Sequence, residues 1–333
     1  MTPSMALELR GTLGKDGLGW LFSARSQDPA DRTPIWVRWI PPGGLHDTEH
    51  SDRVWRIQEA LSGLTHPFIP RLLGHGKLDH GLALAFAQPM GTRLSALRPG
   101  TWNNDTAWAL LHALAEGLQA LHSATQADTG EALELVHRGL SADGLYLRRD
   151  GGLACWETDT IRGTWAGHRE SPSERLGHRH APEQLRGLDS QASDIFEVGV
   201  IVAKRLVQGP GPVDPALVDL LSRCRAAEQD QRPTAAELLG LAGDHSGGLA
   251  AVAQGLDVPW DEGDALHGLV GEVVEMARPP WTPAPEPSPA TPPPASHQAP
   301  PPSATATPAD LRNALPHDRE SLRRLLAESR GDS

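Results

Sequence analysis

The 333-residue sequence predicts an α+β protein built from two lobes. Short segments of β-branched and aromatic residues, separated by glycines and turns, occur in about residues 8–90, which favours strands there. Apolar residues at helical spacing dominate about residues 91–243. Because strands and helices are segregated along the chain, the α+β class is favoured over an alternating α/β arrangement.

Four segments define the expected first lobe. Residues 7–25 have glycines between apolar pairs, which predicts a hairpin. Residues 34–40, "PIWVRWI", and residues 81–88, "GLALAFAQ", predict strands. Residues 52–64 carry apolar residues at positions 54, 57, 61 and 64, so we expect one helix between these strands.

The second lobe is expected to be mostly helical. Residues 106–124 are periodic throughout. Residues 193–209 predict a buried helix that starts at Ser193 or Asp194 and ends at Gly209. Residues 233–243 begin with a proline and end with a glycine, which predicts a further helix.

The C-terminal quarter has a different composition. Residues 244–277 are expected to form a helical extension, in which 264–277 is a helix that either packs back on the second lobe or binds a partner. Residues 278–308 are rich in proline and predict a disordered linker. Residues 309–333 predict a short amphipathic tail helix at about 317–329, and residues 1–7 form an N-terminal tail.

Composition excludes several classes of partner and compartment. The formal net charge of −12 argues against nucleic acid and against an anionic membrane surface. Two cysteines, Cys155 and Cys224, are too few for a disulfide framework and fit a reducing compartment. The start lacks the pattern of a signal peptide, and the longest apolar stretch is too short to cross a bilayer. We therefore expect a soluble, cytoplasmic protein.

Eight motifs follow one another along the chain: "LGKDGLGWLFSAR", "PIWVRWI", "LTHPFIPRLLGHG", "LVHRGLSADGLYL", "GGLACWETD", "HAPEQ", "SDIFEVG" and "DQRPTAAELL". Their order resembles that of the protein kinase family, particularly the bacterial Ser/Thr type, over roughly residues 8–243. The resemblance implies a two-lobed protein kinase-like fold, with a small β-rich N-lobe at about 8–90 and a large helical C-lobe at about 91–243.

The resemblance places nucleotide-binding positions on residues that suit a nucleotide poorly. Gly14, Gly17 and Gly19 match the Gly-rich loop only in part, and ordinary hairpin glycines are the alternative interpretation. Trp36 stands where a small residue would face adenine, and Arg38 replaces the phosphate-binding lysine. We expect Trp36, together with Trp156, to fill the cleft; a core tryptophan is the alternative for Trp36. The glutamate that pairs with the lysine falls on Ile57, and Glu59 lies on another face of the expected helix.

The positions that the resemblance assigns to catalysis are degenerate. The general base falls on Gly139, the neighbouring amine on Ser141 and the metal-binding asparagine on Gly144. The metal-binding aspartate falls on Glu157, whose extra methylene alters magnesium geometry, and Asp143 is the other weak candidate for a metal ligand.

By contrast, the positions that the resemblance assigns to structural support are retained. They include a buried ion pair, Glu183 with Arg232, and a carboxylate, Asp194, that caps the backbone of the loop at His137 and Arg138. The retained anchors are His137, Arg138, Glu183, Asp194, Gly199 and Arg232.

The loss of catalytic positions beside retained anchors predicts a catalytically dead or severely impaired protein kinase-like protein. We expect a scaffold or allosteric regulatory partner that binds another protein, such as an active kinase or its substrate, with no cofactor. The alternative is an atypical active Ser/Thr protein kinase that uses Arg38, Glu157 and Asp143 with ATP and Mg. A third interpretation is an adaptor that acts mainly through its tail, so that deletion of residues 309–333 abolishes partner capture.

Overall fold

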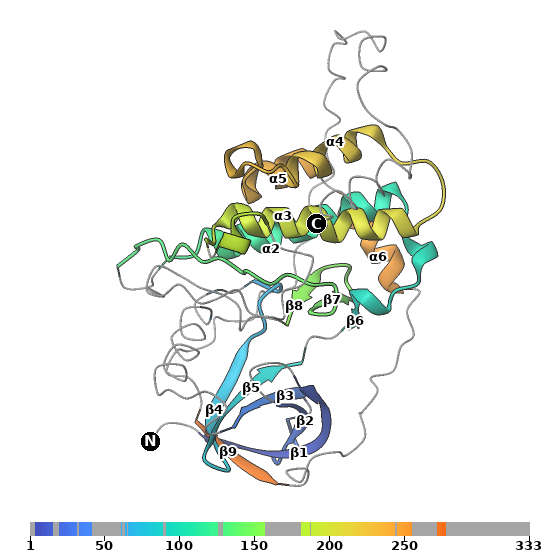
Figure 1. The fold of residues 1–333 in the computed structure, drawn as a ribbon. Helices are drawn as coiled ribbons and strands as arrows, with labels where there is room; N and C mark the ends of the chain where they lie inside the picture. Colours follow the sequence, from blue (N-terminus) through green and yellow to red (C-terminus); the bar gives the residue numbers. More distant parts are fainter. Residues whose placement is uncertain are drawn as a thin grey trace, which may run out of the picture.

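A barrel of strands and a separate group of helices with a small sheet make up the described part of the chain (Figure 1). The computed structural model describes residues 4–15, 20–31, 33–41, 61, 64, 66–88, 91–125, 129–156, 181–186, 188–243, 245–254 and 272–277.

The barrel has six antiparallel strands in the closed order β1-β2-β3-β5-β4-β9. Alternate side chains point into it, because successive residues of a strand face opposite sides. Its interior contains Leu7, Leu9, Phe22 and Val37, each at 0% exposure. The strands are β1 (Ser4–Lys15), β2 (Trp20–Ser26), β3 (Ile35–Ile40), β4 (Leu72–Leu78), β5 (Gly81–Ala87) and β9 (Val273–Ala277).

A three-stranded sheet lies between the barrel and the helices (Figure 1). Its strands are β6 (Gly91–Arg93), β7 (Leu145–Arg148) and β8 (Leu153–Cys155), in that order across the sheet. The outer face of the barrel meets this sheet through one cluster of buried apolar residues, which includes Trp36 from β3, Phe86 from β5 and Tyr146 from β7.

The longest helix, α2 (Asn104–His122), packs against the other helices through a continuous apolar face. Asn103 and Thr106 cap its first turn reciprocally, so two backbone N–H groups that the helix leaves unpaired gain acceptors. The others are α3 (Gln191–Gln208), α4 (Pro215–Cys224), α5 (Ala235–Ala242) and α6 (Ser246–Gln254). Short 3-10 helices lie at Leu94–Ala96, Pro99–Thr101, Gln184–Arg186 and Gln229–Gln231.

The expected two-lobed kinase-like fold is wrong. The N-terminal strands do not form the sheet of a small lobe but a closed six-stranded barrel, because β9 pairs with both β1 and β4. After residue 91 the described residues contain five helices of 8 to 19 residues beside a three-stranded sheet, which is not a large helical lobe.

The expected helix at 264–277 is also wrong at its end, because Val273–Ala277 is strand β9. Val273 and Val274, which fit a helical stripe in the sequence, instead face the outside and the inside of the barrel, at 45% and 1% exposure. Residues 264–271, the linker at 278–308 and the tail helix lie outside the described residues. So does the expected helix at 52–64, apart from Leu61 and Leu64.

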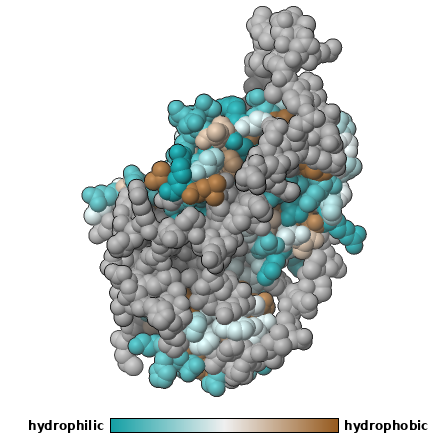
Figure 2. All heavy atoms as spheres, viewed as in Figure 1, coloured by the Kyte–Doolittle hydropathy of each residue, from teal (hydrophilic) through white to brown (hydrophobic). Residues whose placement is uncertain are grey.

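The expected strands at 34–40 and 81–88 and the expected helices at 106–124, 193–209 and 233–243 are present with small shifts of their ends. Hydrophilic and intermediate residues cover much of the described surface in Figure 2, with hydrophobic residues in small groups. Among the described residues, no helix combines the length and the apolar character that crossing a membrane requires.

Candidate functional site

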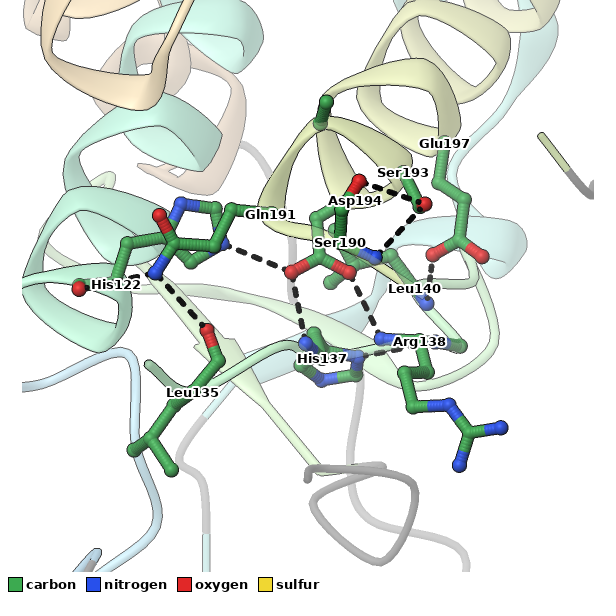
Figure 3. A network of polar contacts seen from close by, with 12 residues as sticks. His122, Leu135, His137, Arg138, Leu140, Ser190, Gln191, Ser193, Asp194 and Glu197 are labelled. Carbon is green, nitrogen blue, oxygen red and sulfur yellow. Dashed lines mark hydrogen bonds and ion pairs between the residues drawn. The ribbon is translucent and has the colours of Figure 1, made fainter. Parts of the chain in front are cut away.

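The loop at residues 137–140, which the resemblance assigns to catalysis, is held by carboxylates of helix α3 (Figure 3). Asp194 Oδ2 accepts a hydrogen bond from the backbone N–H of His137 at 2.7 Å, and Oδ1 accepts one from Arg138 at 2.8 Å. His122 Nε2 lies 2.9 Å from the same Oδ2. The structure thus brings three of the expected anchors together, with Asp194 capping the loop.

Glu197, three residues further along α3, extends this network. Its Oε2 accepts the backbone N–H of Leu140 at 2.7 Å. Residues three apart on a helix share a face, so Asp194 and Glu197 point at the same loop. Gln191 adds bonds from its side-chain amide to the carbonyl oxygens of His122 and Leu135, at 3.1 and 3.4 Å. The sequence interpretation missed Glu197 and Gln191, although their spacing around Asp194 was a usable signal.

Two features of this loop bear directly on chemistry. Arg138 adopts a φ of 70°, and its guanidinium Nε lies 2.7 Å from Asp189 Oδ2 in an ion pair. Gly139 follows it and has no side chain, so no carboxylate extends from that position to accept a proton. The carboxylates of Asp194 and Glu197 are both occupied by backbone donors, and each is at most 1% exposed.

The next turn joins the remaining degenerate positions. Ser141 is buried, and its Oγ accepts the backbone N–H of Gly144 at 3.0 Å. The carbonyl oxygen of Gly144 accepts the N–H of Trp156 at 2.6 Å, which ties this turn to the end of β8. Asp143 is exposed. Glu157 lies outside the described residues, so the structure describes the position of only one of the two candidate metal ligands, Asp143.

Trp36 and Trp156 meet in the space between the barrel and the small sheet. Their ring centroids lie 4.5 Å apart with the planes at 87°, an edge-to-face arrangement. Tyr146 and Phe86 contact these two indoles at centroid distances of 5.5 and 5.2 Å. We call Trp36, Phe86, Tyr146 and Trp156 the aromatic cluster; each is at most 6% exposed.

Arg38 lies beside the aromatic cluster. It shares a face of β3 with Trp36, and its guanidinium carbon lies 5.2 Å from the centre of the Trp156 ring. Only 2% of Arg38 is exposed. The structure therefore brings Trp36 and Trp156 together in the interior and places Arg38 against the Trp156 ring, a contact that the sequence interpretation did not predict.

The expected Gly-rich loop is described only at its start. Gly14 is exposed, has a φ of 150°, and has no atom within 4 Å of the place where a Cβ would stand. Its backbone conformation, rather than close contact, therefore favours glycine there. Gly17 and Gly19 lie outside the described residues.

Glu183 and Arg232 form a fully buried ion pair with two parallel hydrogen bonds, of 2.6 and 2.9 Å. Ser193 donates a third bond to Glu183, at 2.6 Å. Burial alone would raise the pKa of Glu183, but the hydrogen bonds from Arg232 and Ser193 outweigh it and hold that pKa below its ordinary value. This pair joins the segment before α3 to the segment before α5.

Gly199 allows α3 to lie close to the end of α4. A Cβ at this position would stand 2.9 Å from the Cβ of Cys224 and 2.8 Å from the Cγ of Arg225. Any larger residue would therefore force the two segments apart, which gives the expected anchor its structural role.

A contact that the sequence interpretation missed joins His137 to Cys155. His137 Nε2 lies 3.0 Å from Cys155 Sγ, and both residues are at 0% exposure. The two residues are 18 positions apart and on different elements, so no local pattern pointed to this pair. The contact links the loop at 137–140 to strand β8 and, through the next residue, to the aromatic cluster.

The described residues around the loop at 137–140 therefore form a hydrogen-bonded network that joins α2, α3 and β8. Within them, no group of three or more His, Cys, Asp or Glu side chains could hold a metal ion. Every carboxylate that faces the loop at 137–140 from α3 is already bound to backbone N–H groups. No protein-family model matches the chain, and no curated protein matches it.

Proposed function

We propose that this protein acts by binding another protein, as a scaffold or allosteric regulatory partner, and does not transfer phosphate. The chain resembles kinases in its motifs and not in its fold, and the residues that phosphate transfer requires are absent at the matching positions. The observation that carries the proposal is the aromatic cluster, in which Trp36 and Trp156, at the positions that the resemblance assigns to the base pocket, are packed against each other.

Two contacts and one missing side chain support the proposal. The indoles of Trp36 and Trp156 pack against each other at 4.5 Å, which leaves no room for a purine between them. Arg38 lies against the Trp156 ring at 2% exposure, where a triphosphate in water could reach it only after unpacking. Gly139 offers no base, and loss of a positioned base costs about 10²–10⁴ in rate.

The partner that fits this proposal is a protein, such as an active kinase or its substrate. The net charge of −12 disfavours nucleic acid and anionic membranes. Both cysteines are free and buried, which suits the reducing cytoplasm in which we place the protein.

The test combines a transfer assay with a capture experiment. Purified protein is incubated with radiolabelled ATP, Mg²⁺ and generic Ser/Thr substrates, and we expect no label above a heat-denatured control. The full chain and a chain ending at residue 308 are then used to purify partners from the cells of origin.

We expect both chains to capture the same partner, because the proposal assigns binding to the folded part. Capture only by the full chain would assign binding to the tail at 309–333 instead. Label transfer that disappears in Glu157→Ala would contradict the proposal and favour an atypical kinase.

A further inference from the structure

A seam between the first and fourth strands of the barrel is filled by a strand from the other end of the chain. Strand β9 pairs with β1 over five residues, from Ser4 opposite Ala277 to Glu8 opposite Val273. On its other edge it pairs with His75 and Gly76 of β4. A single short strand therefore satisfies backbone groups on two edges that would otherwise be open.

The seam is shaped for this strand. A Cβ at Gly76 would stand 2.3 Å from the carbonyl oxygen of Glu275, and one at Gly74 would stand 3.0 Å from the Cβ of Met276. Glycine at both positions thus lets β9 approach β4 closely. Val274 and Met276 enter the barrel interior, whereas Val273 stays 45% exposed on the outside.

Backbone pairing and these apolar side chains are the contacts described between β9 and the barrel. Helix α6 packs against α2, whereas β9 lies at the end of the barrel that is far from the helices (Figure 1). The connection from Gln254 to Glu272 can span up to roughly 60 Å when extended. That reach is enough to serve the barrel of a neighbouring molecule as well as its own.

We propose that the seam between β1 and β4 is a strand-binding site that also accepts β9 of a second copy of this chain, which yields a strand-exchanged dimer. A second copy is the occupant because its β9 has the same residues and fits the same glycines in the same register. Exchange of an identical element keeps every contact that the monomer makes.

Concentration decides which copy fills the seam. The contacts of β9 with the seam are identical within one chain and between two chains. The covalent connection, however, holds the chain's own β9 near the seam at an effective concentration of order millimolar, so its own strand is favoured. The exchanged dimer is therefore a minor species at micromolar protein and increases with concentration. An irreversible trap is needed to accumulate it.

A disulfide across β1 and β9 supplies this trap. Leu9 N donates to Glu272 O at 3.0 Å, so this pair is hydrogen-bonded, and the pairs alternate along the strands. Ala6 and Glu275 are consequently a non-hydrogen-bonded pair, with Cα atoms about 4.5 Å apart, which suits a disulfide. Both residues lie on the outer face of the barrel.

The experiment mixes full-length A6C with full-length E275C, one of which carries a size tag, under mild oxidation. We expect a disulfide-linked heterodimer that grows with time and with protein concentration. The matched control is V273C, which is also exposed on β9 but sits two residues out of register with Ala6. We expect at least a tenfold lower yield of its heterodimer with A6C.

The double variant A6C/E275C checks the geometry, since it should oxidise within one molecule. If that double variant oxidises fully while the mixed single variants give no more heterodimer than the V273C control, the seam accepts only its own strand and the proposal is overturned. A heterodimer that is equally abundant with V273C also overturns it, because random collision then explains the product.

Discussion

The indole of Trp36 meets the indole of Trp156 edge to face, with ring centroids 4.5 Å apart. The two residues come from β3 and from the end of β8, so this one contact joins the barrel to the small sheet. Edge-to-face aromatic pairs contribute about 0.5–1.5 kcal/mol beyond their buried area. This contact between the two indoles therefore stabilises the fold.

Truncation of Trp36 should be strongly destabilising. Trp36→Ala leaves a large void among Phe86, Tyr146 and Trp156, and changes of this kind cost about 3–5 kcal/mol. Urea unfolding, monitored by circular dichroism, measures the decrease in the free energy of unfolding. Trp20→Ala, at a half-buried position on β2, is the control and should cost less. Equal losses for the two variants would show that the aromatic cluster is not tightly packed.

Asp194 should be essential for the loop at 137–140. Asp194→Ala leaves the buried N–H of His137 and the N–H of Arg138 without their acceptor, at about 1–3 kcal/mol each. The same unfolding measurement checks this expectation. Asp219→Ala, at an exposed position on α4, should change stability by less than about 0.5 kcal/mol. A loss no larger for Asp194→Ala than for this control would contradict the capping role.

The buried pair of Glu183 and Arg232 predicts a pH dependence. The pKa of Glu183 is lower in the folded protein than in the unfolded chain, so its contribution to stability is fully present above the ordinary glutamate pKa of about 4.3. That contribution is lost as pH falls through the lower folded pKa. Unfolding free energies measured from pH 7 to pH 3 should therefore fall more steeply for the wild type than for Glu183→Gln. Parallel curves would contradict this assignment.

At neutral pH, removal of one partner of this pair should be costly. Arg232→Ala strands a buried carboxylate and should destabilise the protein by about 3–5 kcal/mol. A double replacement of Glu183 and Arg232 by apolar residues removes both charges and should cost less than the two single changes added together. Additive losses in this double-mutant cycle would show that the two side chains do not interact.

Both thiols should be unreactive in the folded protein. Cys155 and Cys224 are buried, and burial raises the pKa of Cys224 to about 12. A chromogenic thiol reagent should therefore detect no fast-reacting group in the native state and two groups in denaturant. Rapid reaction of Cys224 without denaturant would show that α3 and α4 separate at Gly199, and rapid reaction of Cys155 would show that β8 separates from the loop at 137–140.

The turn between β4 and β5 offers a stabilising substitution. Asp79 and His80 have φ values of 45° and 61°, a left-handed conformation that side chains rarely adopt and that favours Asn-Gly in a two-residue hairpin. D79N/H80G should therefore raise stability by about 1 kcal/mol, measured as a higher urea midpoint. His80→Ala still places a residue with a side chain at a positive φ, so it should not raise the urea midpoint. A lower midpoint for D79N/H80G would contradict this account of the turn.

Periodicity found the long elements of the fold because their signals are local. The apolar spacing at 106–124 corresponds to α2, and the β-branched run at 34–40 corresponds to β3. The barrel could not be predicted in this way, since its closure depends on β9 pairing with β1 more than 250 residues earlier in the chain. The short run at 273–277 also fits a helical stripe, and periodicity cannot distinguish the two in so few residues.

In the candidate site, contacts between residues of recognisable motifs could be predicted, and contacts outside the motifs could not. The resemblance identified Asp194 with His137, and Glu183 with Arg232, as residues that belong together, and the structure places each pair in contact. The contact between His137 and Cys155 could not be predicted, because it depends on how β8 packs against the loop.

The most direct test of the claim that the protein binds no ATP is to measure the melting temperature of the full-length protein at increasing concentrations of ATP with Mg²⁺. A ligand at 100 times its dissociation constant adds about 2.7 kcal/mol of stability, so even weak binding is visible at millimolar ATP. We predict an unchanged melting temperature, because Trp36 and Trp156, which stand at the positions that the resemblance assigns to the base pocket, are packed against each other. A magnesium-dependent rise that saturates with ATP would contradict the account.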